Sequence, residues 1–248
     1  MVVGCALVLA LVAGIRGTWS PCGLSMLSAI NPVSEAGRGH RYGLTCLWFV
    51  AGSLAGGLGL GAAMAVAALP LGLLGGTALV AVGLVGAIAT LASDLRVGGF
   101  QLPVHPRQVD ETWFGAYRRW VYAAGFGAQI GVGFATYVMT AGTYLMAWLA
   151  ALCGSPVWAL AVGGVFGTVR GAAVLLSAHA HSPEQLRLLH HRLAALDPWS
   201  LRAAIGVQAL VAVVLGLALA GTAGGLVTLA GVLALAARPV LKKTPSPA

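Results

Sequence analysis

Charged side chains are scarce in this sequence, where Asp, Glu, Lys and Arg together make up 8% of the 248 residues. Soluble domains carry about 25% charged residues, so the scarcity excludes an ordinary soluble protein. Hydrophobic residues account for 59% of the chain, and the mean hydropathy is +0.91. The apolar stretches reach the roughly 20 residues that a membrane-spanning helix needs, whereas a membrane barrel shows shorter alternating segments. We therefore expect an all-α polytopic membrane protein.

Acidic residues and cysteines are too few for several kinds of site. Asp and Glu number only 6, and no carboxylate lies deep in an expected span, which argues against a carboxylate-based proton or cation relay. The 4 cysteines do not form the disulfide framework of a secreted protein. The histidine pairs at 179/181 and 190/191 lack the cysteine or carboxylate cluster that completes a metal site. We expect no metal and no cofactor.

The hydrophobic pattern predicts six to seven membrane-spanning helices in a single integral membrane domain over residues 1–248. The expected spans are 3–31, broken at Pro21, and 42–66, 70–94, 121–151, 156–178, 203–220 and 223–240. Glycines at 221, 224 and 225 favour a hairpin between the last two spans. The final segment is short, so six spans are the alternative.

Basic residues predict the orientation, because cytoplasmic loops of membrane proteins are enriched in Lys and Arg. The loops 32–41, 95–120 and 179–202 fall on one side and contain Arg38, Arg41, Arg96, Arg107, Arg118, Arg119, Arg187, Arg192 and Arg202. If the hairpin forms, Arg238, Lys242 and Lys243 join them. We expect a multi-pass protein of the cytoplasmic (inner) membrane, with an extracytoplasmic N-terminus and a cytoplasmic C-terminus. The net charge of +8 then reflects topology and attraction to membrane lipid, and no nucleic-acid partner is expected.

Glycine is abundant, with 36 residues, and recurs at every fourth position in several spans. Small residues at this spacing let helix backbones approach closely inside a membrane. The pairs and triplet are Gly52/Gly56, Gly57/Gly61, Gly127/Gly131 and Gly163/Gly167/Gly171. The spacing predicts tight helix packing rather than a phosphate-binding loop.

Ser20-Pro21-Cys22 interrupts the first apolar stretch. Proline lacks an amide hydrogen and favours the first turn of a helix, and a preceding serine caps the free N–H groups. Cys22 then occupies the second helical position, where the helix dipole favours a thiolate while burial in hydrocarbon opposes it. A thiol at a helix break inside lipid is the first candidate for a functional residue.

These features resemble the CcdA/DsbD transmembrane thiol–disulfide electron transporters of cytochrome c biogenesis, within the LysE-type transporter superfamily. The resemblance rests on the Ser20-Pro21-Cys22 break, the Asn31-Pro32 exit, a short basic loop and a second set of three spans, and it covers about residues 10–180. It implies two inverted three-helix repeats with a broken first helix, here 1–95 and 121–220. Residues 221–248 then form an additional hydrophobic segment and a basic tail.

The resemblance also implies a function. In that family the first and fourth spans each present a cysteine, and the pair passes electrons from a cytoplasmic thioredoxin-like donor to an extracytoplasmic thiol acceptor. Cys22 matches the first cysteine, but aligning Gly17 with Gly133 places Val138 where the second would stand. The expected function is a membrane thiol-redox protein, a thiol-disulfide oxidoreductase, with Pro21, Cys22 and Cys46 as candidate catalytic residues. The alternative is a LysE-type transporter or exporter of a small sulfur-containing or anionic solute.

Several polar residues inside the spans are candidates for substrate binding. A cation inside the bilayer costs at least ~2.5 kcal/mol on insertion scales, so it normally faces a cavity, pairs with another group or reaches an interface. Transporters with broken helices bind substrate near such breaks. The candidates are Arg16, Gln129, Thr136, Tyr137 and Arg170. Helix packing and contacts with lipid headgroups are the alternative roles for these side chains.

Overall fold

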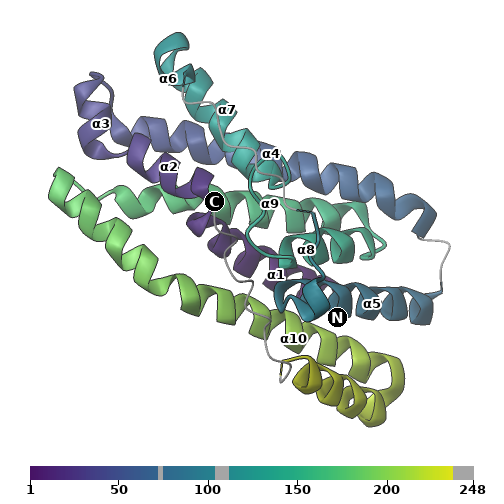
Figure 1. Ribbon diagram of the computed structural model, residues 1–248. Coiled ribbons are helices and arrows are strands. Elements are labelled where there is room, and N and C mark those ends of the chain that lie inside the picture. The colour runs from purple at the N-terminus through teal and green to yellow at the C-terminus, as the bar shows by residue number, and fades with distance from the viewer. Residues whose placement is uncertain (72–74, 104–111, 237–248) are drawn as a thin grey trace.

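The computed structural model describes residues 1–71, 75–103 and 112–236 (Figure 1). Over these ranges the regular structure is entirely helical, which confirms the expected all-α class. Five helical segments are long and apolar enough to cross a membrane, as expected for a membrane protein. They are Val2–Trp19, Tyr42–Leu71, Gly76–Asp94, Pro156–Ser177 and Pro183–Ala236.

The prediction of six to seven spanning helices exceeds these five for two reasons. The expected fourth span is divided into α7 (Arg119–Val132) and α8 (Gly142–Ala151), and neither helix is long enough to cross a membrane alone. The expected sixth and seventh spans are joined in α10 (Pro183–Ala236), whose backbone leaves helical geometry at Ala220 and Gly221. Figure 1 shows the chain reversing at this point, as the predicted hairpin requires.

The first span is interrupted where the sequence predicts. α1 (Val2–Arg16) continues into a 3-10 turn, η1 (Gly17–Trp19), and α2 (Pro21–Ala29) begins at the proline. The Gly23 N–H donates to the Ser20 hydroxyl oxygen at 3.0 Å, so Ser20 is the N-cap of α2. A second cap of the same kind starts α3 (Pro32–Gly37), where the Ser34 N–H donates to Asn31 Oδ1 at 2.9 Å.

The centre of the bundle is a close contact of α4 (Tyr42–Leu71) with α7 and α9 (Pro156–Ala172). Glycines make this contact possible, as their spacing predicts. A methyl group on Gly127 would overlap the backbone of Phe49, and one on Gly57 would overlap the backbone of Gly163. The three helices therefore pack backbone to backbone, and they hold the neighbouring broken segments in fixed positions.

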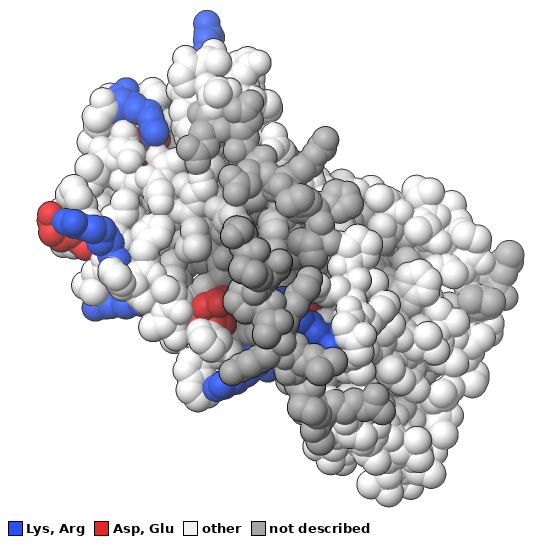
Figure 2. Space-filling model, in the orientation of Figure 1, with Lys and Arg blue, Asp and Glu red and all other residues white. Residues whose placement is uncertain are grey.

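The remaining elements lie around this centre. α5 (Gly76–Asp94) packs against α10, and α8 packs against α1 and α4. The other segments are η2 (Val97–Gly99), α6 (Trp113–Ala116) and η3 (Ala173–Ser177). On the face drawn in Figure 2, charged side chains gather toward the end of the molecule that carries α3, α6 and the start of α10, and around its middle, while none is visible toward the opposite end. Arg107, Arg238, Lys242 and Lys243, which enter the orientation argument, lie outside the described residues.

Candidate functional site

A second helix break, which the sequence analysis did not predict, lies between α7 and α8. α7 ends at Val132, the next residue, Gly133, has a φ of +77° that is unfavourable for other residues, and the chain is irregular until α8 begins. Asp94, at the end of α5, caps α8 from outside by accepting hydrogen bonds from the Thr140 hydroxyl and from the Ala141 N–H, the latter at 2.7 Å. Gln208 Nε2 donates to the same carboxylate at 2.7 Å. The break is therefore held by contacts from two other helices.

Arg170 of α9 lies between the two breaks. Its guanidinium donates to Thr136 Oγ1 at 3.1 Å and to the carbonyl oxygens of Tyr137 at 3.3 Å and Gly133 at 3.5 Å, all in the second break. A methyl group on Gly17, in the first break, would lie 2.7 Å from Arg170 Nε. Arg170 is 4% exposed, and no described residue forms an ion pair with it. A buried cation is thus hydrogen-bonded to the second break and packs closely against the first, while its Nε has no hydrogen-bond partner among the described residues.

The second intramembrane arginine, Arg16, pairs elsewhere. It is also 4% exposed, and its Nη1 donates to the Asp197 carboxylate and to Ser200 Oγ, the latter at 2.7 Å. Its Nε has no hydrogen-bond acceptor among the described residues. Arg16 also lines a cavity of about 230 Å³ together with Asp94, Tyr137 and other residues of the second break. We call this the Arg16 cavity.

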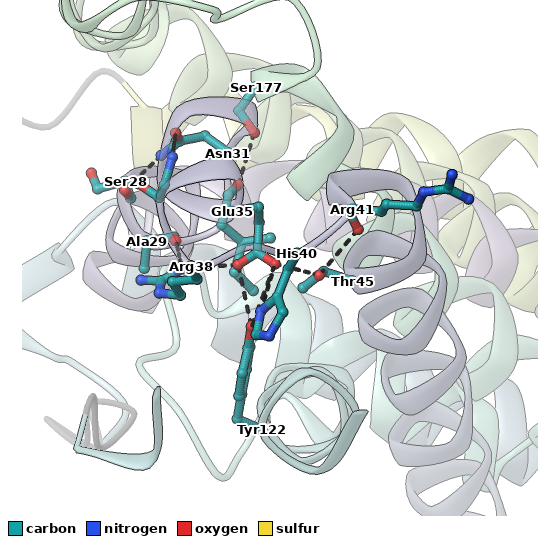
Figure 3. A network of polar contacts seen from close by, with 12 residues as sticks. Ser28, Ala29, Asn31, Glu35, Arg38, His40, Arg41, Thr45, Tyr122 and Ser177 are labelled. Atoms are coloured by element: carbon teal, nitrogen blue, oxygen red, sulfur yellow. Dashed lines mark hydrogen bonds and ion pairs between the residues drawn. The ribbon is translucent and has the colours of Figure 1, made fainter. Parts of the chain in front are cut away.

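A third polar cluster surrounds Glu35 of α3, whose side chain is 0% exposed (Figure 3). Its carboxylate accepts hydrogen bonds from Arg38 Nη1 at 2.8 Å, the Thr45 hydroxyl at 2.5 Å and the Tyr122 hydroxyl at 3.2 Å. His40 Nδ1 lies 3.6 Å from Glu35 Oε2 and 3.3 Å from the Tyr122 oxygen. The cluster fastens the short loop helix to α4 and α7, so a fully buried carboxylate is stabilised by donors from three elements.

The predicted catalytic residues occupy an apolar setting. Cys22 is 1% exposed and shares one hydrophobic cluster with Cys46, Met26 and Phe49. Pro21 forms the first turn of α2. No disulfide bond joins any of the four cysteines, Cys5, Cys22, Cys46 and Cys153, all of which the structure describes. Within the described ranges, no three His, Cys, Asp or Glu side chains are grouped to hold a metal ion.

The predicted substrate-binding residues divide between two places. Arg170 and Thr136 meet at the second break, and Tyr137 both lines the Arg16 cavity and contacts Arg170 through its carbonyl oxygen. Gln129 lies on α7, before the break, and is joined to neither place by a hydrogen bond between described residues. Sequence reasoning missed Asp94, Glu35 and Gln208, whose partners lie between 46 and 114 positions away in most cases. Gly133 was the available signal for the second break.

Five curated relatives match the chain, and all are named methylamine utilization protein MauF. The protein from Paracoccus denitrificans is 31% identical over 181 residues, which are 68% of this chain and 62% of the relative. The protein from Paracoccus versutus is 30% identical over 175 residues, or 66% and 62%. The protein from Methylobacillus flagellatus is 30% identical over 174 residues, or 67% and 60%. The matched segment thus spans about three fifths of the length of these relatives.

No protein-family model matches the chain, and no solved structure matches it significantly.

These relatives correct the family and the function inferred from the sequence. The assignment to the CcdA/DsbD transporters is wrong, because the similarity found is to proteins named MauF. The thiol-redox function in cytochrome c biogenesis and the alternative of a LysE-type exporter are wrong for the same reason. The physical cause of the error is the Ser20-Pro21 step, a local device that starts any interrupted helix and specifies no chemistry for Cys22.

Proposed function

We propose that this chain is a MauF-like membrane protein that serves methylamine utilisation. The observation that carries the proposal is the shared name of the five relatives, with the P. denitrificans protein 31% identical over 181 residues. The match includes 68% of the chain, so it extends over several of the helices. The similarity therefore reflects a shared membrane scaffold rather than one short motif.

The contacts of Arg170 support it as the functional centre of this scaffold. Burial of a cation in a low-dielectric environment is costly, so intramembrane arginines are retained where they have a task. Packing alone would be satisfied by an apolar side chain, yet Arg170 reaches the carbonyl groups of the second break and lies against Gly17 of the first. We infer that it holds the two breaks in a defined arrangement.

The order of the helices supports the two inverted three-helix repeats as part of this proposal. A broken segment, α1 with α2, precedes α4 and α5, and a second broken segment, α7 with α8, precedes α9 and α10. Broken helices in corresponding positions of two halves are typical of membrane proteins built from repeats. The arginines at the α3 and α6 end favour a cytoplasmic location for that end, and an extracytoplasmic N-terminus.

Membrane lipid is the partner that we propose. Large apolar side chains are exposed along the helices, among them Leu47, Val66, Leu69, Val85 and Val157. In water such side chains would form exposed hydrophobic patches, whereas lipid tails cover them without loss. The thioredoxin-like donor and the thiol acceptor depended on the redox interpretation, and they are not part of this proposal.

A complementation experiment tests the proposed function. The gene of the relative is deleted in P. denitrificans, and the strain receives this chain, the relative itself or an empty vector. We expect this chain to restore growth on methylamine as the sole carbon source, with growth on succinate equal in all strains. Failure to restore growth, with the chain present in the membrane fraction at the level of the relative, would contradict the proposal.

A further inference from the structure

A groove lies where the apolar segment of α9 and η3 ends and α10 begins. It has a volume of about 380 Å³, and Leu176, His179, Leu188 and Arg192 contribute to its lining. The apolar segment, which is long enough to cross a membrane, ends at Ser177. The groove therefore lies at the edge of the part of the protein that is suited to hydrocarbon. We call it the Arg192 groove.

The Arg192 groove carries a positive charge that no described residue neutralises. Arg192 is the one charged side chain among the described residues that line the groove. It is exposed, and within the described ranges it forms neither a hydrogen bond nor an ion pair. The two acidic residues of α10 are engaged elsewhere, Glu184 with Arg187 and Asp197 with Arg16. The guanidinium of Arg192 is thus available to an anionic group.

Neutral polar side chains line the groove together with this charge. The amide oxygen of Gln185 accepts a hydrogen bond from the His181 N–H at 2.7 Å, which leaves the Gln185 Nε2 group as a donor. The ring of His179 has no hydrogen-bond partner in the described part of the chain. These groups can add hydrogen bonds to a ligand, but the charge of Arg192 is what selects an anion.

Exposed apolar side chains surround the groove. Leu175 and Leu176 are 50% and 49% exposed at the end of η3, and Leu188 is 50% exposed on α10. Further along α10, Trp199 is 65% exposed, and the guanidinium carbon of Arg202 lies 5.1 Å from the centroid of its ring. Exposed Trp and Arg residues at the end of a spanning helix are typical of the headgroup region of a bilayer. The groove thus faces lipid as well as water.

An anionic phospholipid matches both the charged and the apolar part of the groove. Guanidinium groups bind phosphate through charge-assisted hydrogen bonds, and basic pockets at the ends of membrane helices bind anionic headgroups. A zwitterionic lipid carries an ammonium group that would offset this attraction. We propose that the Arg192 groove binds the headgroup of an anionic phospholipid, with the acyl chains along Leu176 and Leu188. This inference rests on the proposed lipid partner and does not depend on methylamine utilisation.

Native mass spectrometry of the full-length protein in detergent tests this proposal with soluble probes. Dioctanoyl-phosphatidylglycerol is the anionic lipid, dioctanoyl-phosphatidylcholine the zwitterionic lipid, and glycerol 3-phosphate the phosphate ester without acyl chains. One basic residue near the membrane surface changes the affinity for an anionic lipid about fivefold, so we expect phosphatidylglycerol to bind at least that much more tightly than either other probe. Equal affinity for the two lipids would overturn selection by charge. Glycerol 3-phosphate bound as tightly as phosphatidylglycerol would show a site for a soluble phosphate ester and would also overturn the proposal.

Two matched variants locate the binding. Arg192→Gln and Arg187→Gln each remove one exposed positive charge from α10, and of the two only Arg192 lines the groove. We expect the affinity for phosphatidylglycerol to fall about fivefold in Arg192→Gln and to stay unchanged in Arg187→Gln. Equal weakening in both variants, or unchanged affinity in Arg192→Gln, would overturn the site. Both side chains are exposed, so both variants should melt like wild type. Methylamine-dependent growth is a separate readout, so failure of the proposed function can be distinguished from failure of this site.

Discussion

The buried Glu35 cluster leads to a sharp prediction because the chain contains its own control. Glu35 and Arg38 form an ion pair three positions apart, and so do Glu184 and Arg187. The first glutamate is 0% exposed, whereas both side chains of the second pair are 72% exposed. Replacement of each glutamate by glutamine keeps the size of the side chain and removes the charge, so the two variants isolate the effect of burial.

The expected loss for Glu35→Gln follows from its hydrogen bonds. The carboxylate accepts from Arg38, Thr45 and Tyr122, and an amide would replace one of its acceptor oxygens with a second donor. The substitution weakens these charged hydrogen bonds and places the N–H donors of the glutamine amide against the donors of the cluster, which costs about 2 to 4 kcal/mol. For a chain of this size that corresponds to a fall in melting temperature of roughly 4 to 16 °C.

Thermal unfolding of the purified protein in nanodiscs, followed by circular dichroism, measures this difference. We expect Glu35→Gln to melt at a clearly lower temperature, and Glu184→Gln to melt like wild type because exposed ion pairs contribute little. Equal melting temperatures for the two variants would refute the argument that burial of Glu35 stabilises the α3, α4 and α7 junction.

Three further predictions concern other parts of the fold. Gly127→Ala should prevent normal packing of α4 on α7, because the added methyl group meets the Phe49 backbone. Gly59→Ala, at a position with open space around it, is the control. Gel filtration measures the folded fraction of both variants. Gly127→Ala eluting as wild type would contradict the close contact. Gly221→Ala should destabilise the C-terminal hairpin by about 1 to 3 kcal/mol, because the backbone at Gly221 has a φ of 60° and a ψ of −148°. Gly231→Ala, at a position with open space around it, should not destabilise the hairpin. Limited proteolysis compares the two variants, and equal cleavage would show that the turn is not strained. Cys22→Ser with Cys46→Ser should retain methylamine-dependent growth in the complementation strain; loss of growth at unchanged membrane levels would restore a role for these thiols.

The parts of the fold that depend on local signals could be predicted from the sequence. Ser20 and Pro21 start α2 by capping and by ring geometry, and both effects act within a few residues. The turn at Gly221 and the close packing at Gly127 follow from residue type in the same way. Each of these signals is contained in one segment of the chain, so periodicity and propensity are sufficient to find it.

The candidate site could be predicted only in part, because most of its contacts join distant segments. Arg170 and Thr136 were recognised as unusual polar residues in apolar spans, but nothing local shows that Arg16 pairs with Asp197, which lies 181 positions away. Burial of Glu35 depends on Tyr122 of α7, which a loop sequence does not reveal. The similarity to MauF proteins could not be predicted from one motif, because it is spread over 181 residues at 31% identity, whereas Pro21-Cys22 is short and conspicuous.

The central claim is that Arg170, between the two helix breaks, is the functional centre of a protein of methylamine utilisation. The most direct test is growth of the complemented P. denitrificans strain with Arg170→Gln, with Arg118→Gln as the charge-matched control. Membrane levels and melting temperatures of both variants are measured alongside growth. We predict that Arg170→Gln is folded and present but fails to support growth on methylamine, while Arg118→Gln grows like wild type. Normal growth of Arg170→Gln on methylamine would contradict the account.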